Sequence, residues 1–122
     1  MRRYAAEIFD GANIAYSLEM EEQFATRKLN MEQRRDVFLI FKEALNNIYK
    51  HARAKNVSMI LKIENKKLHF IITDDGKGFD TGAITSRNGI KNMQQRIDKW
   101  QGTFSIQSAP GMGTKTAFIL PV

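Results

Sequence analysis

The segment from residue 31 to residue 52 constrains this chain most, because it is the longest stretch with the 3.6-residue period of an amphipathic helix. Asn30 followed by Gln33 resembles a capping box, which predicts a helix that begins at Met31 and runs to about Ala52. One side of this helix is apolar, with Phe41, Leu45, Ile48 and Ala52. A neighbouring row is polar, with Glu43, Asn46, Asn47 and Lys50.

This polar row is unusual for a purely structural helix. The side chains of Asn46 and Asn47 compete for backbone hydrogen bonds, so two adjacent amides in mid-helix lower its local stability. The residues alone leave two interpretations open. The row is either a solvated face or part of a binding site.

Two strands in phase with each other follow the helix. Residues 57–63 and 68–74 each alternate apolar and polar side chains across a turn at ENKK, which predicts a hairpin. Asp74 shares the phase of Leu68, Phe70 and Ile72, so it is expected on the face that meets the helices. Burying a carboxylate there alone would cost roughly several kcal/mol, so it must be paired, solvated by a cleft or bound to a ligand. The alternative is an ordinary turn-starting Asp before DGKG.

The flanking segments complete an α/β pattern within one predicted domain, residues 1–122. Residues 3–10 predict a helix with Tyr4 and Ile8 inward, closed by Gly11, and residues 14–20 alternate as a strand. A second helix is expected from Gly89, with Asn88 as its N-cap and Gly102 as its end. The strands TFSIQS and TKTAFILPV then form a hairpin around APGMG.

Two of these glycine segments could meet a ligand. A helix that starts at Gly89 offers free N–H groups and a positive dipole end to an anion, although many helices begin in this way. Gly111 and Gly113 could let the backbone approach a ligand closely, and the alternative is an ordinary flexible hairpin loop.

Composition narrows the classes of function. The chain has no cysteine, which excludes disulfides, thiolate metal sites and a Cys nucleophile. Its longest apolar run, residues 37–41, cannot span a bilayer, so the sequence predicts a soluble, cytoplasmic domain without membrane contact. The formal charge of +6 favours an anionic partner, but the basic residues are dispersed, so we expect no direct nucleic-acid binding and consider a nucleotide instead.

Taken together, four motifs resemble the ATP-binding domain shared by sensor histidine kinases and the wider GHKL ATPase family. EALNNIYKH resembles the N box, DDGKGF the G1 box, GIKNM the G2 box and SAPGMGT the final glycine motif. The subgroup of nitrate-responsive and lipid-fluidity sensors is the most similar, because it has Glu at the head of the N box and a short lid, here about residues 79–92. Two features depart from the common family pattern, since the lid has no aromatic-rich segment and Asn92 stands where many members have Gly.

The resemblance implies a fold and a division of roles along the helix. The fold is a two-layer α/β sandwich whose mixed, largely antiparallel five-stranded sheet carries three helices on one face. Asn47 would coordinate Mg²⁺, and Glu43 would be the general base for a phospho-accepting histidine. Lys50 would face phosphate, and His51 would do so or would serve only as a cation at the helix end.

The loops would hold the rest of ATP. By the same resemblance, Asp74 accepts a hydrogen bond from the exocyclic amine of adenine, Gly76 and Gly78 let the backbone pass the base, and the Thr114 hydroxyl supports Asp74. The backbone amides from Gly89 to Met93, including those of Ile90 and Asn92, would hold phosphates, near Gly111 and Gly113.

Neither His51 nor His69 is expected to accept phosphate, so the helical-hairpin domain that carries the acceptor histidine and the dimer interface is expected to be absent from this chain. Its partners would be that acceptor domain and, downstream, a response regulator. The chain would then be a cytoplasmic domain, or the cytosolic part of a membrane-anchored kinase. The alternatives are a free-standing serine kinase of the anti-sigma-factor type, a non-catalytic nucleotide-binding module, and a basic domain that docks nucleic acid.

Overall fold

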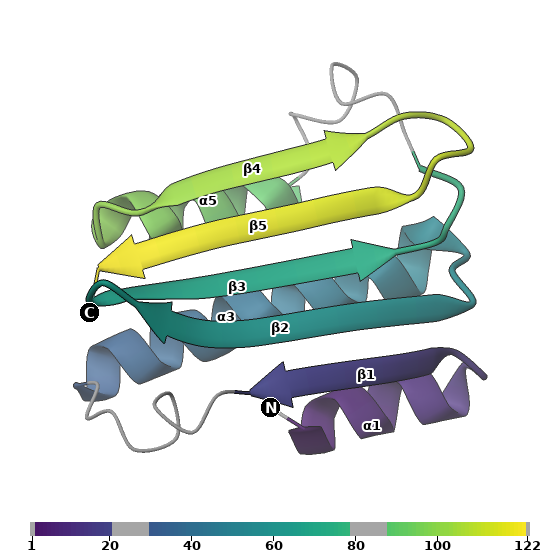
Figure 1. Ribbon diagram of the computed structural model, residues 1–122, viewed down its shortest axis with the longest axis horizontal. Helices are drawn as coiled ribbons and strands as arrows, with labels where there is room; N and C mark the ends of the chain where they lie inside the picture. Colours follow the sequence, from purple (N-terminus) through teal and green to yellow (C-terminus); the bar gives the residue numbers. More distant parts are fainter. Residues whose placement is uncertain (1, 21–29, 79–87, 122) are drawn as a thin grey trace.

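The computed structural model describes residues 2–20, 30–78 and 88–121. Its elements, in chain order, are α1 (Arg2–Gly11), β1 (Ala15–Met20), α3 (Met31–Asn47), the π-helical turn η1 (Ile48–Ala52), β2 (Asn56–Glu64), β3 (Lys67–Asp74), α5 (Asn88–Lys99), β4 (Thr103–Ser108) and β5 (Thr114–Pro121). Each expected helix and strand is therefore present (Figure 1).

The five strands form one mixed sheet in the order β1-β2-β3-β5-β4. β1 and β2 run parallel, and the other neighbouring pairs run antiparallel. Figure 1 shows α1, α3 and α5 together on one face of this sheet. The predicted two-layer α/β sandwich with three helices on one face is confirmed.

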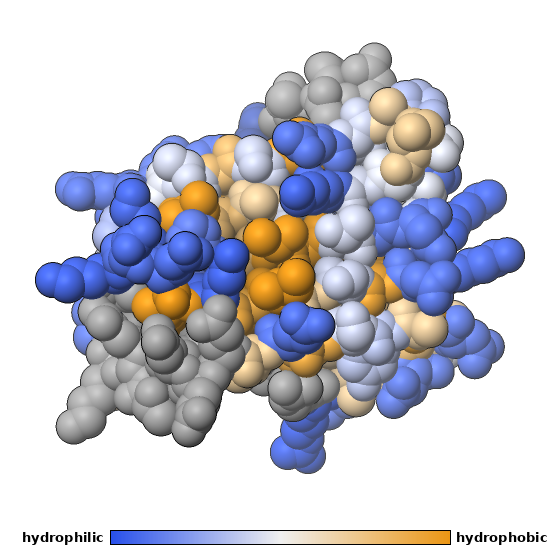
Figure 2. Space-filling model, in the orientation of Figure 1, coloured by the Kyte–Doolittle hydropathy of each residue, from blue (hydrophilic) through white to orange (hydrophobic). Residues whose placement is uncertain are grey.

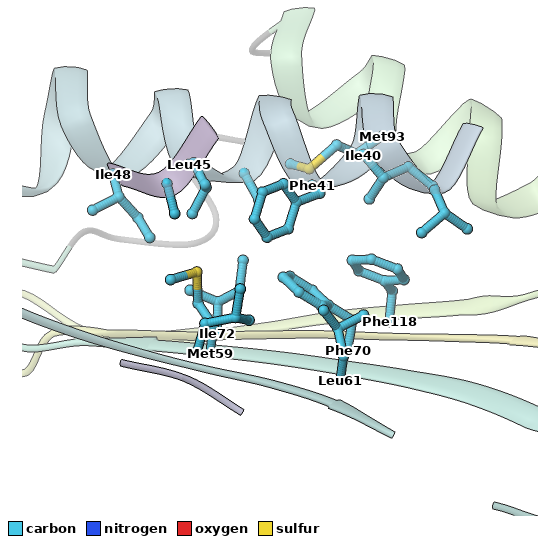
Figure 3. Close-up of a cluster of buried hydrophobic side chains, with 14 of the residues drawn as sticks. Ile40, Phe41, Leu45, Ile48, Met59, Leu61, Phe70, Ile72, Met93 and Phe118 are labelled. Carbon is cyan, nitrogen blue, oxygen red and sulfur yellow. The ribbon is translucent and has the colours of Figure 1, made fainter. Parts of the chain in front are cut away.

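The core lies between α3 and the centre of the sheet. Phe41 of α3 meets Phe70 of β3 edge-on at 5.4 Å between ring centroids, and Phe70 packs on Phe118 of β5 at 4.9 Å. Figure 3 shows that Leu45 of α3 and Ile48 at the start of η1 continue this contact with the sheet. Each such side chain contributes about 1.5–3 kcal/mol through burial. The large apolar side chains that are almost completely buried are Phe9, Phe41, Phe70, Phe118, Ile40, Leu45, Met59, Leu61, Leu68, Ile72, Met93 and Ile97.

The opposite face of the sheet carries the alternate residues of each strand. Half-buried Ile60, Ile71 and Ala117 lie next to one another in register and form a small apolar centre, visible in Figure 2. Ser17, Ser58 and Thr73 form a polar row beside it. The alternation predicted from the sequence therefore separates the two faces correctly.

Two glycine signals at helix ends differ from their expected use. Gly11 does not end α1 in a left-handed conformation, because Asn13 takes that conformation, with φ of 58°. Beyond α5 the left-handed residue is Gln101, also with φ of 58°, and not Gly102. Gly102 is needed for space, because a Cβ atom there would overlap the backbone carbonyl of Ile119.

The start of α3 agrees with the sequence in part. The Asn30 side chain accepts a hydrogen bond from the Gln33 backbone N–H at 2.7 Å, as an N-cap should. The Gln33 side chain, however, does not complete a capping box. It donates to the carbonyl oxygen of Pro121 at 3.4 Å and so connects α3 to the last strand.

Candidate functional site

The polar row of α3 lies where the regular helix ends. Glu43, Asn46 and Asn47 are half-buried, and Lys50 is exposed. The helix was expected to stay regular to Ala52, but residues 48–52 form one π-helical turn, at whose start the Ile48 N–H contacts the carbonyls of both Ala44 and Leu45. Single π turns within helices are frequent at functional sites, because they re-aim side chains at a local cost. The side chain of His51 lies outside what the structure describes.

Asp74 ends the apolar row of β3, as its phase predicted, and is only 6% exposed. Its Oδ1 atom accepts a hydrogen bond from the Gly76 backbone N–H at 2.8 Å. Burial raises the pKa of Asp74, and Asp75 raises it further, against the backbone hydrogen bonds from Gly76 and Thr114, which lower it. Within the described residues no cation forms an ion pair with Asp74. Its carboxylate therefore keeps capacity for another donor.

The neighbouring Asp75 has a structural role that was not predicted from the sequence. Its carboxylate accepts hydrogen bonds from the backbone N–H groups of Lys55 and Asn56 at 2.8 and 2.9 Å. It also accepts one from the Asn56 side chain at 2.9 Å. The bonds from the Asn56 side chain, the Asn56 backbone and the Lys55 backbone lower the pKa of Asp75 to about 2. Asp75 thus ties the chain after η1 to the end of β3, next to Asp74.

Two glycines bring the neighbouring loops together at Asp74. Gly78 has φ of 65°, and a Cβ atom on it would overlap the carbonyl of Ala109 in the β4–β5 loop. Gly113 has φ of 72°, and a Cβ atom on it would overlap the carbonyl of Asp74. Both positions therefore favour glycine on account of packing as well as backbone conformation.

The remaining glycines of these motifs behave differently. Gly111 has φ of 81° but open space around it. Gly76 is buried, does not have a positive φ and donates its N–H to Asp74. The backbone was expected to approach a ligand closely at all four glycines. Of these, Gly111 has open space around it that a ligand could occupy.

Thr114 stands opposite Asp74 in the pairing of β3 with β5. Its hydroxyl lies 2.9 Å from the Ser108 hydroxyl, and its support of Asp74 comes from its backbone. The role predicted for the Thr114 hydroxyl therefore falls to the main chain.

The helix α5 begins at the same end of the molecule. In Figure 1 α5 lies behind β4 and β5, and its start points toward the side of the molecule at which β3 ends. Within its first turns Met93 is buried, Ile90 is half-buried and Asn92 is exposed. Gly89 lies in the first turn, and most of the expected lid, residues 79–87, lies outside the described residues. The segment after η1, the DDGKG turn and the β4–β5 loop thus meet around the end of β3, and the GIKNM motif lies in the first turns of α5.

Comparison with known families agrees with this geometry. Residues 32–122 match the family model for histidine kinase-, DNA gyrase B- and HSP90-like ATPases. The chain belongs to this ATPase family. The match covers α3, η1 and every later element, so all four motifs lie inside it.

Individual relatives are sensor kinases. The sensor histidine kinase LiaS of Bacillus subtilis (strain 168) is 33% identical over 87 residues, which are 70% of this chain and 24% of LiaS. The histidine-protein kinase/phosphatase UhpB of Salmonella typhimurium is 33% identical over 93 residues, which are 76% of this chain and 18% of UhpB. This chain therefore spans only about a quarter or less of these relatives. The predicted subgroup stays a prediction.

Solved structures show the same fold. The histidine kinase domain of the blue-light activated histidine kinase from Erythrobacter litoralis superposes with a TM-score of 0.83 at 18% identity, covering 98% of this chain and 58% of that domain. Histidine kinase AdeS of Acinetobacter baumannii superposes with a TM-score of 0.76 at 13% identity, covering 98% of this chain and 62% of the AdeS chain.

A second buried carboxylate fixes α5 in this ATPase domain. Asp36 of α3 is 5% exposed and accepts hydrogen bonds from Trp100 Nε1 at 2.7 Å and Lys99 Nζ at 3.0 Å. Burial would raise the pKa of Asp36, but the bonds from Trp100 and Lys99 and the charges of Lys99 and Arg96 outweigh it and lower the pKa. The sequence analysis missed Asp36, although it lies one turn before Ile40 on the buried side of the helix, which is the signal that identified Asp74.

The described residues show neither a metal-binding cluster nor a membrane-spanning helix. No group of three or more His, Cys, Asp or Glu side chains there could hold a metal ion alone. No helix among them is both long and apolar enough to cross a bilayer.

Proposed function

We propose that this chain is the ATP-binding catalytic domain of a two-component sensor histidine kinase, which binds Mg²⁺-ATP and passes its γ-phosphate to a histidine of a separate dimerisation domain. Asp74 carries the proposal. It is a buried carboxylate without an ion-pair partner among the described residues, and one of its oxygens is fixed by Gly76. Such a group can accept a hydrogen bond from the exocyclic amine of adenine, whereas guanine presents a carbonyl oxygen at that position.

The residues of the polar row suit the phosphate end of ATP. Asn47 offers a hard, neutral amide oxygen where the regular helix ends, and Mg²⁺ usually takes its other ligands from phosphate oxygens and water. Mg²⁺, when bound with ATP, would neutralise part of the phosphate charge. Exposed Lys50 would approach the phosphates, with His51 as a further candidate, and the first-turn amides of α5 would donate to them.

Glu43 lies one helical turn before Asn47 and would accept the proton of the acceptor imidazole. The imidazole nitrogen then attacks the γ-phosphorus, the bond to the β-phosphate oxygen breaks, and ADP leaves. Because the acceptor histidine belongs to another domain, this domain alone should bind ATP but transfer no phosphate. A response regulator would receive the phosphate afterwards.

Nucleotide selectivity tests the binding half of the proposal. Isothermal titration of the chain with non-hydrolysable ATP and GTP analogues in Mg²⁺ should show at least about tenfold weaker binding of the GTP analogue, because two acceptors would face each other at Asp74. Equal affinities, or no binding of either analogue, would contradict the assignment of the site.

Phosphate transfer tests the catalytic half. With Mg²⁺-ATP and a purified helical-hairpin domain of a sensor kinase, we expect acid-labile phosphate on that domain. Glu43→Gln should keep the ATP affinity and reduce transfer, while the surface variant Glu64→Gln should change neither. Transfer by Glu43→Gln at the parent rate would disprove its role as base, and acid-stable phosphate on a protein substrate would favour the serine-kinase alternative.

A further inference from the structure

Asn46, the member of the polar row without an evident ligand, is held by a residue 42 positions earlier in the chain. The Tyr4 hydroxyl of α1 donates a hydrogen bond to Asn46 Oδ1 at 3.1 Å. This hydrogen bond connects α1 to the polar row, and both side chains are half-buried.

The Tyr4 ring is fixed on three sides, so its hydroxyl has a defined direction. It meets Phe38 edge-on at 6.0 Å and Phe41 at 6.5 Å between ring centroids, and the ammonium of Lys42 lies 5.5 Å from its centroid. These contacts keep the ring in place whether or not the hydroxyl is present. The hydrogen bond can therefore be removed without removing the packing.

The bond acts where α3 changes its helical form. Asn46 precedes Asn47, the last residue of the regular helix, and the π turn begins at Ile48. A π turn replaces the usual backbone bonding pattern, so the direction of the adjacent side chains depends more on contacts from outside the helix. Tyr4 supplies such a contact one residue before Asn47.

The charges around the hydroxyl keep it a donor. Burial raises the pKa of Tyr4, the bond to Asn46 lowers it, and the nearby carboxylates of Glu43 and Glu7 raise it further. The result is a pKa above the ordinary value for tyrosine, so the phenol stays protonated at neutral pH. Glu43, the proposed base, is therefore one of the charges that act on the Tyr4 hydroxyl.

We infer that Tyr4 is a positioning residue for the metal and phosphate end of the site, acting through Asn46 on the row from Glu43 to Asn47. The inference rests on the proposed function. Mg²⁺ demands near-ideal octahedral geometry, so a small displacement of the Asn47 side chain would strongly weaken its contribution to Mg²⁺ binding. Asp74 lies on β3, away from this hydrogen bond, so adenine recognition should not depend on Tyr4.

The test distinguishes an effect on the phosphate and metal end of the nucleotide from an effect on adenine binding. The affinity for an ATP analogue is measured in Mg²⁺ and in EDTA for the parent, Tyr4→Phe, Asn46→Ala and the double variant. The gain in affinity on adding Mg²⁺ should fall by about threefold or more in Tyr4→Phe, the size that one neutral hydrogen bond supports, with affinity in EDTA unchanged. The double variant should lose no more than Asn46→Ala alone. Tyr16→Phe, which removes the same hydroxyl from β1, should match the parent.

Thermal unfolding of the same variants without nucleotide gives an independent readout of the bond. The double-mutant cycle should show coupling of about threefold in the unfolding equilibrium constant. An unchanged Mg²⁺-dependent gain in Tyr4→Phe, or an equal loss in Mg²⁺ and in EDTA, would overturn the positioning role while leaving the proposed function intact. Failure of the parent chain to bind the ATP analogue would instead overturn the proposed function and this inference with it.

Discussion

Replacing Asp74 by Asn should separate the stability of the fold from nucleotide binding. Asp74 Oδ1 accepts the Gly76 backbone N–H at 2.8 Å. In Asp74→Asn the amide oxygen is best kept at that N–H, so the amide NH₂ group takes the place of Oδ2. If adenine is the ligand, its exocyclic amine then faces a donor instead of an acceptor.

The expected loss of affinity follows from this geometry. A hydrogen bond to a charged acceptor is worth about 1.5–3 kcal/mol, and a buried donor without an acceptor costs about 1–3 kcal/mol. Together they weaken binding by about 3 kcal/mol or more, which is at least about a hundredfold in Kd. Binding of an ATP analogue should therefore be undetectable at micromolar concentrations of the chain.

The stability of the unligated chain, in contrast, should not fall in Asp74→Asn. Because burial raises the pKa of Asp74, the folded chain holds this proton more tightly than the unfolded chain does. Ionisation of Asp74 therefore lowers stability as pH rises above the unfolded value, about 3.9, until the pH has passed the raised pKa of the folded chain. Asp74→Asn removes that cost, so its unfolding temperature at pH 7 should equal or exceed that of the parent.

Differential scanning fluorimetry with and without Mg²⁺ and an ATP analogue measures both effects. The parent and the surface control Asp98→Asn should be stabilised by the analogue, and Asp74→Asn should not. Stabilisation of Asp74→Asn equal to that of the parent would refute the adenine assignment. An unfolding temperature of unligated Asp74→Asn well below that of the parent would refute the reasoning about buried charge.

Other variants test the glycine loops, the contact of Asp36 in α3 with the end of α5, and the stability of the chain at low pH. Gly113→Ala should lower both stability and nucleotide affinity more than Gly111→Ala, because both have positive φ but only Gly113 lies against a backbone carbonyl; unfolding and titration measure this, and equal losses would exclude packing as the cause. Asp36→Ala should lower the free energy of unfolding by about 2 kcal/mol, or about 8 °C in unfolding temperature, because the Trp100 N–H loses its acceptor. Asp36→Asn, which keeps an acceptor, should lose less, and equal losses in urea denaturation would exclude this explanation. The folded-state pKa values of Asp36 and Asp75 are depressed, that of Asp75 to about 2, so the stability they add is present above pH 4 and lost as pH falls toward 2. Urea unfolding between pH 5 and pH 2 should show this loss, and a smaller one in Asp75→Asn.

The sequence predicted the layers of this fold well, because burial itself sets the period of apolar residues in helices and strands. The row Leu68, Phe70 and Ile72 is buried as expected, and so are Phe41 and Leu45 of α3. The four motifs named by the family resemblance all lie within residues 32–122, which match the family model. Side-chain period alone is sufficient for such assignments when each element has one buried face.

Local backbone choices were less predictable. The π turn over residues 48–52 spans too few residues for its period to differ visibly from that of an α-helix. The left-handed conformations lie at Asn13, two residues after Gly11, and at Gln101, directly before Gly102, because glycine makes this conformation inexpensive without being required for it. Long-range pairs such as Tyr4 and Asn46 leave no periodic signal at all.

The two buried carboxylates show where sequence reasoning about a site must end and geometry must begin. Asp36 lies within an apolar row and Asp74 ends one, so the same periodic signal marks both, although only Asp74 was predicted as a functional residue. In the fold, Asp36 meets Lys99 and Trp100, and its pKa is lowered, whereas Asp74 has only backbone donors among the described residues and its pKa is raised. A carboxylate that is already satisfied serves the structure, while one that is buried at a cost and still has a free acceptor position is available to a ligand. The Asn variants at the two positions should therefore shift the unligated stability at pH 7 in opposite directions, and only the one at Asp74 should remove nucleotide binding.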